Sequence, residues 1–498
     1  IFYNDGSIPA LAADAEVILE GETTDSNFGS LGVGEFNSDG KTDLAVGAMR
    51  YLNYKGRLYI YTFNDSQIVG ASGEQLGASL VSGDFNADGR TDLAVGARAY
   101  STNTGRVYIF YNDGSMPTAA ASADTAIDGE TTSNYFGRFL AAGDFNADGR
   151  TDLAVGASWY SVRTGRAYIF YNDGSYPASA SSADATITGE ATDDYFGISL
   201  APGDFNSDGR VDLAVGAQSY VDSGRVYIFY NDGSYPTEAS SADATITGES
   251  GTSGQFGTCV VAGDFNADGR TDLAVGANLY STNTGQVYIF YNDGSMPTEA
   301  VSADAIIAGE AEGNYFGWVI VAGDFNADGR TDLAVAAQAY ATDAGRAYIF
   351  YNDGSYSAGA SSADITITGQ AATNFGTSLA AGDFNADGKT DLAVGAQAYS
   401  TNTGRVYIFY TGAAIPVDVT ATSLVMTGEA ADSKFGSFLS AGDFNADGKT
   451  DLAVGANGFD SNAGKFYIYI TEAKTYTIQT GTKINGTIKL DQGQVLFK

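Results

Sequence analysis

One short string recurs along this chain, and its spacing constrains the fold more than any other feature. Copies or near copies of DFNADGRTDLAVGA begin at Glu35, Asp84, Asp144, Asp204, Asp264, Asp324, Asp383 and Asp443. The intervals between these starts are 59 or 60 residues, except for the first, which is 49. A fixed period of this length indicates a repeat architecture, in which each unit packs mainly against its neighbours.

Each unit contains the pattern of four short strands. In the unit that opens with Phe136, these are an apolar segment at 138–142, a continuous apolar run at 153–157, a β-forming segment at 166–171 and an alternating segment at 185–188. A continuous apolar run is typical of a strand buried on both faces, whereas alternation indicates a half-exposed strand. We therefore expect burial to decline from the first two strands to the fourth. Four antiparallel strands per repeat predict the blades of an all-β propeller.

Eight units predict an eight-bladed propeller, with seven blades plus an extra unit as the alternative. The expected organisation is an N-terminal segment at 1–22, the propeller at 23–472 and a C-terminal β extension at 473–498. The short unit at 49–83 lacks the long Asn-Asp-Gly-Ser connection of the others. Because the deletion falls in a loop, we expect this unit to keep its strands and to survive as a blade.

The repeated loop has the pattern Asp-x-Asn-x-Asp-Gly-x-x-Asp, which suits a hard cation. Ca²⁺ takes six to eight oxygen ligands, and the second loop offers side-chain oxygens at Asp84, Asn86, Asp88 and Asp92 and the carbonyl of Arg90. The loop differs from an EF-hand, because no helix pattern flanks it and its twelfth residue is not Glu. Mg²⁺ is the weaker alternative, and a metal-free polar turn would be plausible for a single copy but not for eight.

The same positions in all copies give the predicted ligand set for up to eight Ca²⁺ ions, with the seventh position acting through its carbonyl. These residues are Glu35, Asn37, Asp39, Lys41, Asp43, Asp84, Asn86, Asp88, Arg90, Asp92, Asp144, Asn146, Asp148, Arg150, Asp152, Asp204, Asn206, Asp208, Arg210, Asp212, Asp264, Asn266, Asp268, Arg270, Asp272, Asp324, Asn326, Asp328, Arg330, Asp332, Asp383, Asn385, Asp387, Lys389, Asp391, Asp443, Asn445, Asp447, Lys449 and Asp451.

Charge and composition narrow the partners and the compartment. The formal net charge of −35 argues against a nucleic-acid partner, and no apolar run is long enough to span a membrane. The lone Cys259 allows no intramolecular disulfide, so bound ions, rather than disulfide bonds, would stabilise the fold. Extracellular calcium modules often bind at roughly 10⁻⁴–10⁻³ M and would stay empty in the cytosol. We therefore expect a secreted or cell-surface protein.

The motifs Phe136-Gly137, Asp144–Gly149 and Asp152–Ala157 resemble FG-GAP repeats, the blade units of the integrin α-subunit propeller. The resemblance implies that the calcium loop joins strands one and two on one face, and that ligands dock on the opposite face. Here that face would hold 100–105, 160–165 and 280–285, together with 129–135 and 189–195.

Two features depart from the integrin pattern. Integrin-type propellers have seven blades, and Glu35 replaces Asp at the first position of the first loop. The resemblance also implies that an N-terminal strand completes the last blade, for which we expect 17–20 to pair within the blade at 435–470. The chain begins inside a repeat, since Ile1–Ser7 is identical to Ile109–Ser115, so we expect further sequence upstream.

The leading function hypothesis is a non-enzymatic, calcium-stabilised extracellular propeller for adhesion, surface structure or protein binding. A carbohydrate-binding, lectin-like propeller is the alternative, so the partner would be an extracellular protein or a glycan, and a polysaccharide-active enzyme ranks third. The chain has no His, the commonest general base. The one-off residues Trp159, Arg163, Cys259 and Trp318 are interpreted as packing or loop variation.

Overall fold

The computed structural model places the chain in two units. One contains Ile1–Asp65 and Glu472–Lys498, and the other contains Ser66–Thr471. The expected propeller at 23–472 is therefore shorter at its N-terminal end. The residues described below are 28–34, 43–48, 57–61, 66–112, 117, 119–249, 254–411, 419, 422, 424–445, 448–469, 471, 489–491 and 494–496.

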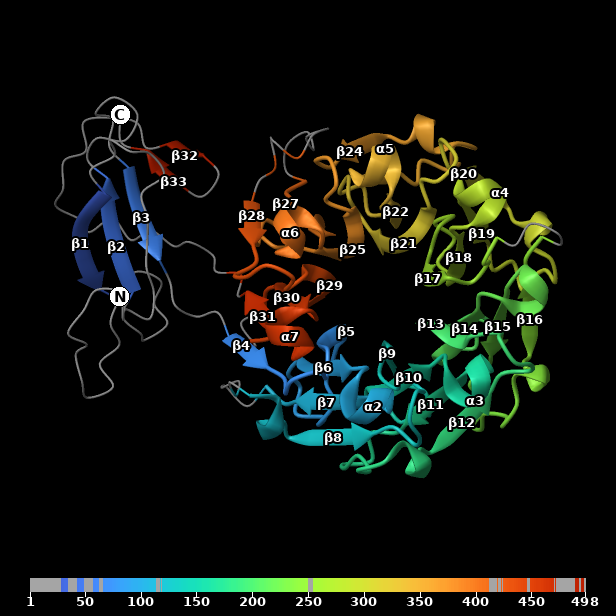
Figure 1. The fold of residues 1–498 in the computed structure, drawn as a ribbon. Coiled ribbons are helices and arrows are strands. Elements are labelled where there is room, and N and C mark those ends of the chain that lie inside the picture. The colour runs from blue at the N-terminus through green and yellow to red at the C-terminus, as the bar shows by residue number, and fades with distance from the viewer. Residues whose placement is uncertain are drawn as a thin grey trace. The chain divides into compact units, whose positions relative to one another are not determined.

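The larger unit is a ring of seven four-stranded antiparallel sheets (Figure 1). Blade 1 has β5 (Leu76–Gly83), β6 (Asp92–Ala97), β7 (Arg106–Phe110) and β8 (Thr125–Asp128), and blade 2 has β9 (Phe139–Gly143), β10 (Asp152–Ala157), β11 (Arg166–Phe170) and β12 (Ala185–Thr188). Blade 3 has β13 (Phe196–Gly203), β14 (Asp212–Ala217), β15 (Arg225–Phe229) and β16 (Ala244–Thr247), and blade 4 has β17 (Cys259–Gly263), β18 (Asp272–Ala277), β19 (Gln286–Phe290) and β20 (Ala305–Ala308). Blade 5 has β21 (Phe316–Gly323), β22 (Asp332–Ala337), β23 (Arg346–Phe350) and β24 (Ile365–Thr368), and blade 6 has β25 (Phe375–Gly382), β26 (Asp391–Ala396), β27 (Arg405–Phe409) and β28 (Leu424–Thr427). Blade 7 has β29 (Phe435–Gly442), β30 (Asp451–Ala456), β31 (Lys465–Tyr469) and β4 (Ser66–Val69).

The seventh blade closes the ring with a strand from the N-terminal side. Its own repeat ends with β31, so the outer position is filled by β4, in which Ile68 pairs with Phe466 and Val69 pairs with Lys465. The expected closing segment, 17–20, lies outside the described residues, and the structure corrects that prediction by assigning the role to β4. The principle of closure by an N-terminal strand holds.

The first repeat is not one of the blades of the ring. Its strands β1 (Phe28–Gly34), β2 (Asp43–Ala48) and β3 (Arg57–Tyr61) form a three-stranded sheet. The eight-blade prediction is therefore wrong, and the alternative of seven blades plus an extra unit is confirmed. The fourth strand of this short unit exists, but as β4 it serves blade 7. Within the predicted C-terminal extension, β32 (Lys489–Asp491) and β33 (Gln494–Leu496) form a hairpin.

Short turns connect the strands. The turns between the second and third strands are the helical segments α2 (Tyr100–Asn103), α3 (Tyr160–Arg163), η4 (Tyr220–Asp222), α4 (Tyr280–Asn283), α5 (Tyr340–Asp343), α6 (Tyr399–Asn402) and α7 (Phe459–Asn462). Turns before the outer strands are η2 (Ala120–Ser122), η3 (Ala180–Ser182), η5 (Ala239–Ser241), η6 (Ala300–Ser302) and η7 (Ala360–Ser362). No helix in the part of the chain that the structure describes is long and apolar enough to cross a membrane.

The core is a set of apolar layers between neighbouring blades. Phe85 of blade 1 and Leu153, Phe136 and Tyr168 at blade 2 belong to one such layer, and the Phe136 ring meets the Tyr168 ring edge-on at 5.2 Å. The most buried strand is the second, because every residue of β10 is buried whereas most of β9 is half-buried. The expected decline in burial from the first two strands to the fourth is therefore wrong for the first strand of this blade, which is less buried than the second and the third. The half-exposed outer strand is confirmed.

Candidate functional site

The predicted metal loops join the first and second strands of each blade, and they share one hydrogen-bonded geometry. In the loop of blade 1, Asp84 Oδ1 accepts from the Asp88 amide at 3.0 Å and Asp84 Oδ2 accepts from the Gly89 amide at 2.9 Å. Asn86 Oδ1 also accepts from the Asp88 amide, and Asp88 Oδ1 accepts from the amide of Arg90. The loop is thus pre-folded around the side-chain oxygens at positions 1, 3 and 5.

The ninth residue of the loop is buried and connects two parts of the blade. Asp152 is fully buried; its Oδ2 accepts from the Phe145 amide at 2.8 Å and its Oδ1 accepts from the Asn172 amide at 2.7 Å. This carboxylate therefore ties the start of the loop to the end of the third strand. The same pair of contacts recurs in the six other blades of the ring, at Asp92, Asp212, Asp272, Asp332, Asp391 and Asp451.

Burial and neighbouring charge make these ninth carboxyls unusual acids. Burial is the main reason that the pKa of Asp152 rises to about 7, and the charges of Asp148 and Asp144 raise it further, against the lowering effect of the two amide hydrogen bonds. The pKa of Asp92 rises to about 6 for the same reasons. Carboxylates of one loop therefore repel one another, which is the electrostatic situation that a bound cation relieves.

Two residues of blade 2 have roles that the motif alone did not predict. The side chain of the seventh residue, predicted to act only through its carbonyl, holds the third strand: Arg150 Nη1 donates to the carbonyl oxygen of Asn172 at 3.1 Å. Asn172 in turn reaches the previous blade, since its Nδ2 donates to the Asp84 carbonyl at 3.3 Å. The signal for this contact is the Asn of the recurrent Ile-Phe-Tyr-Asn string, which by itself indicates only a turn.

The structure describes the predicted ligands completely in some loops and only in part in others. In blades 1 to 6 they lie on one loop, whereas Glu35, Asn37, Asp39 and Lys41 of the first repeat and Asp447 of the last lie outside the described residues. Asp43 is described only as the first residue of β2. Among the described residues, no group of three or more Asp, Glu, His or Cys side chains is gathered so that it could hold a metal ion. The ligand set therefore stays a prediction.

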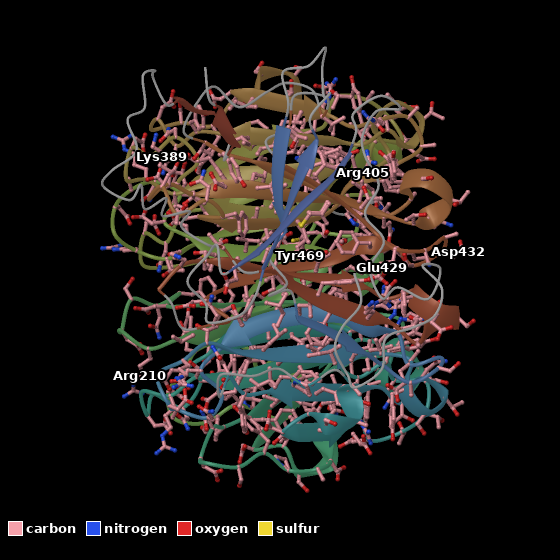
Figure 2. All side chains as sticks on the ribbon, turned by 90° about the vertical axis from the view of Figure 1, so that its left-hand side faces the viewer. Arg210, Lys389, Arg405, Glu429, Asp432 and Tyr469 are labelled. Carbon is pink, nitrogen blue, oxygen red and sulfur yellow. The ribbon has the colours of Figure 1, made fainter. Side chains whose placement is uncertain are left out.

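The turns between strands two and three lie on the face opposite the metal loops. Figure 2 shows Arg210 and Lys389 of the metal loops at one side of the ring, and Arg405, Glu429 and Asp432 at the other side. On this opposite face each turn pairs with the connection to the next blade; for example, the Tyr195 amide donates to the Arg163 carbonyl at 2.8 Å. The expectation that the segments 160–165 and 189–195 share a face is confirmed.

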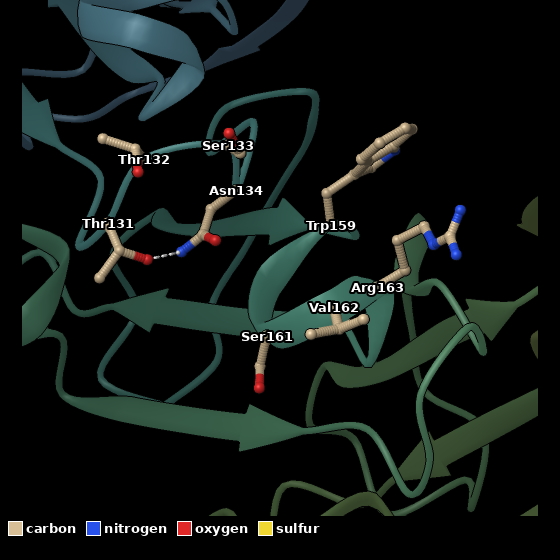
Figure 3. Close-up of a pocket in the computed structure, with 8 residues that line it drawn as sticks. All are labelled: Thr131, Thr132, Ser133, Asn134, Trp159, Ser161, Val162 and Arg163. Carbon is tan, nitrogen blue, oxygen red and sulfur yellow. Dashed lines mark hydrogen bonds between the residues drawn. The ribbon is translucent and has the colours of Figure 1, made fainter.

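The opposite face contains a groove beside blade 2. It has a volume of about 390 Å³ and lies between the residues 131–134 and the turn that carries Trp159, Ser161, Val162 and Arg163 (Figure 3). The lining includes several hydroxyl groups, and Asn134 Nδ2 donates to Thr131 Oγ1 at 2.6 Å. Two of the one-off residues of the sequence, Trp159 and Arg163, thus meet at one groove.

These observations define a seven-bladed β-propeller in which repeated acidic loops mark one face. FG-GAP repeat sequences match at residues 27–61, 76–110, 136–170, 196–229, 256–290, 316–350, 375–409 and 435–469, more than half of the chain. The chain belongs to the FG-GAP repeat family.

Individual relatives are more distant and much longer. Integrin alpha-PS2 of Drosophila melanogaster is 32% identical over 227 residues, which cover 42% of this chain and 16% of the relative. Phosphatidylinositol-glycan-specific phospholipase D of Homo sapiens is 33% identical over 224 residues, covering 41% of this chain and 26% of the relative. The chain thus spans about a quarter or less of these two relatives. Among solved structures, the WD40 domain of Toxoplasma gondii coronin superposes with a TM-score of 0.47 at 13% identity, covering 82% of this chain and 87% of the other.

Proposed function

We propose that the protein is a calcium-stabilised, non-enzymatic propeller that works outside the cytoplasm and binds a partner on the face opposite its metal loops. The observation that carries this proposal is the repetition of one loop geometry around the ring. In blades 1 to 5, the first, third and fifth side chains make the same set of contacts with backbone amides. A geometry repeated at this fidelity suits a structural role that every blade needs.

The residue types of the loops in blades 1 to 6 are those that calcium prefers. Positions 1, 3 and 5 offer exposed carboxylate and amide oxygens, which are the ligands that this hard cation prefers. The ninth carboxylate accepts one amide hydrogen on each oxygen, and an ionised carboxylate has about four lone-pair sites. Asp152 can therefore ligate an ion and keep its backbone contacts. A bound ion would neutralise the carboxylates of the loop and stiffen the hairpin of strands one and two.

The location and the partner are inferred from the loops and the relatives together. Calcium modules of modest affinity fill only where calcium is abundant, as it is outside cells. Integrin alpha-PS2 and the phospholipase D each resemble part of this chain, and the second is an enzyme by name. From the near identity of the blades we infer that this chain contributes a rigid scaffold for adhesion, surface structure or protein binding rather than catalysis.

Calcium removal tests the proposal directly. Thermal unfolding of the whole chain is followed in EDTA, and then with Ca²⁺ or Mg²⁺ restored. A ligand present at a hundred times its Kd stabilises by about 2.7 kcal/mol per site, so we expect EDTA to lower the Tm by many degrees and Ca²⁺ to restore it better than Mg²⁺. Equilibrium dialysis of the Asp148→Asn variant is expected to show one fewer bound ion. An unchanged Tm in EDTA would exclude the calcium role.

A further inference from the structure

Because the blades are nearly identical, a side chain unlike its counterparts is easily identified, and several such side chains occur together near blades 1 and 2. Arg98 occupies a position that is Ser, Gln or Asn in the other blades, and Arg138 follows the Phe-Gly pair where the other repeats have small residues, Ile or Trp. Trp159 takes a position that is Ala, Ser, Leu or Gly in the other blades, and Arg163 takes one that is Asn or Asp. All four lie on the face opposite the metal loops or at its inner edge.

Most of the arginines that recur at the start of the third strand on this face pair with an acid. Arg166 stacks on Tyr160 at 3.8 Å, and its Nη1 lies 3.1 Å from the Glu130 carboxylate. Arg346 makes the equivalent contacts with Tyr340 and Glu310. Arg106 and Arg225 at the same position also pair with a carboxylate, so that four of the five arginines at this position in the ring do; the fifth, Arg405, donates to Thr427 instead.

Arg98 and Arg138 stand at other positions and have other partners. Arg98 Nε donates to Gln75 Oε1 at 2.8 Å, and the Arg138 guanidinium lies 5.4 Å from the centre of the Phe139 ring. Neither guanidinium forms an ion pair with a carboxylate of the described residues. Burial, and then the neighbouring charge of Arg98, lowers the pKa of Arg138 to about 10. Two partly buried cations beside each other, without an acid, form a local field that attracts an anion.

An aromatic cluster connects these arginines to the groove. The Trp159 ring lies 5.1 Å from the Tyr135 ring and 6.0 Å from the Tyr195 ring. The Arg138 amide donates to the Tyr135 carbonyl oxygen at 3.2 Å, and Gly96, two residues before Arg98, packs against the Gly137 carbonyl that precedes Arg138. Arg163 lies over Trp159 at 5.9 Å and pairs with Asp193. The indole N–H of Trp159 is buried and has no hydrogen-bond partner among the described residues.

The groove supplies the third kind of contact. Thr131, Thr132, Ser133 and Ser161 line it with hydroxyl groups, next to Trp159 and Arg163. Hydroxyls exchange hydrogen bonds with other hydroxyls as donor and acceptor, and aromatic surface packs against the C–H face of a sugar ring. A row of hydroxyls, an aromatic cluster and unpaired guanidinium groups together match a saccharide that carries carboxylates better than they match an acidic peptide, which needs only the arginines.

We propose that this groove, together with Arg98 and Arg138 next to its aromatic cluster, binds an oligosaccharide built from uronic acids. The hydroxyl-lined groove and Trp159 would hold the sugar rings, and the two guanidinium groups would hold a carboxylate. The site is a ligand site for the lectin alternative, and it does not rest on the calcium proposal, because none of its residues belongs to a metal loop.

The chain offers a convenient reporter for this binding. It has two tryptophans, Trp159 and Trp318, so the Trp318→Phe variant leaves Trp159 as the only indole. Its fluorescence is followed while a β-1,4-linked mannuronate tetramer is added at constant ionic strength and constant calcium. The neutral β-1,4-mannotetraose, inorganic phosphate and a glutamate-rich peptide are added in parallel. We expect a saturable change with the mannuronate tetramer and at least tenfold weaker binding of the other three.

Variants that restore the residues of other blades test the arginines without threatening the fold. Arg98→Gln copies Gln218, and Arg138→Thr copies Thr258. Combined in the Trp318→Phe protein, they are expected to weaken mannuronate binding at least tenfold with an unchanged Tm. The control Arg405→Gln copies Gln286, removes one charge from the same face at blade 6, and is expected to leave binding unchanged.

Several results would overturn the proposal. Equal binding of mannotetraose would show that carboxylates do not matter, and comparable binding of phosphate would show a general anion site. Arginine-dependent binding of the glutamate peptide with equal affinity would make it a peptide site. No saturable signal in the folded protein, confirmed by calorimetry, or undiminished binding by the double variant would also exclude it.

Discussion

The two faces of the ring differ in which of their contacts repeat from blade to blade. On the metal-loop face, each ninth carboxylate binds the same two backbone amides, and the side chain at position seven holds the third strand in most blades. On the opposite face the backbone contacts repeat, but the side chains differ. The residue before the Phe-Gly pair, for example, is Tyr in blades 2, 3 and 5 and Gln255, Asn374 or Lys434 in others.

This contrast separates the contacts that stabilise the ring from the side chains that can change without loss of the fold. Contacts on the metal-loop face link strands within a blade and, through Asn172, one blade to the next. Side chains on the opposite face are carried by turns whose backbone is fixed, so they can change without loss of the fold. Function on repeat scaffolds is usually placed on such variable positions.

The largest loss of stability is expected from a backbone change on the face opposite the metal loops. Gly165 has a φ of 83°, and an added Cβ would overlap the carbonyl oxygen of Phe196. Gly149 in the metal loop has a similar φ of 86°, but nothing lies within 4 Å of its Cβ position. Gly165→Ala should therefore destabilise by about 4 kcal/mol, from strain and overlap, and Gly149→Ala by about 1 kcal/mol, from strain alone.

Urea unfolding in EDTA measures both glycine variants without the contribution of bound metal. If the two losses were equal, the backbone of the opposite face would be no more constrained than an open loop, and the comparison of the faces would fail.

A smaller effect is expected from the ninth carboxylate. Asp152→Ala leaves the amides of Phe145 and Asn172 buried without their acceptor, which should cost about 3 kcal/mol. The exposed Asp148→Ala, measured in the same EDTA buffer, should cost less than about 1 kcal/mol. A loss for Asp148→Ala as large as that for Asp152→Ala would contradict the assignment of the ninth residue as the structural one.

The smallest effect concerns a buried acid of the opposite face. Burial is the main reason that the pKa of Asp194 rises from 3.8 to about 6, and the charge of Glu190 adds to it. Because the folded-state pKa is higher than the unfolded value, ionisation of this group costs stability, and the cost grows as the pH rises from about 4 to 6 and is constant above. Asp194→Asn should therefore be more stable than the wild type by about 1 kcal/mol at pH 8.

Thermal or urea unfolding at pH 4 and at pH 8 checks this prediction, because the advantage of Asp194→Asn should shrink at the lower pH. Asn134 and Asn314 occupy the equivalent position in other blades, so the substitution suits the fold. Asn134→Asp is the reciprocal variant and should lose stability at pH 8.

The repeat could be read from the sequence, but the number of blades could not. The string around Asp152 and the alternation at 185–188 predicted the strands of blade 2 correctly, because local periodicity reports which face of a strand is buried. Whether the first repeat joins the ring depends on which outer strand pairs with β31, and that contact joins Ile68 to Phe466 across almost the whole chain. No local pattern reports such a pairing.

The candidate sites also depend on contacts that a local sequence pattern does not report. The spacing of acidic residues identified the metal loops, but it did not show that Asp152 is buried against two amides, because burial depends on the neighbouring strand. The grouping of Arg98, Arg138 and Trp159 depends on the packing of adjacent blades. Each residue alone is an unremarkable departure from the repeat, and only the ring places them together.

The closure of blade 7 by β4 has a consequence for the order of events during synthesis. The chain makes β4 before any residue of the ring's seven complete repeats, but its partner β31 is the last strand of the ring to be made. Until Tyr469 has been synthesised, the hydrogen-bonding edge of β4 has no native partner, and an unpaired edge strand invites pairing with other chains. A ribosome that stops early would therefore release a protein with two open ends, whose first and last blades can join only those of another molecule.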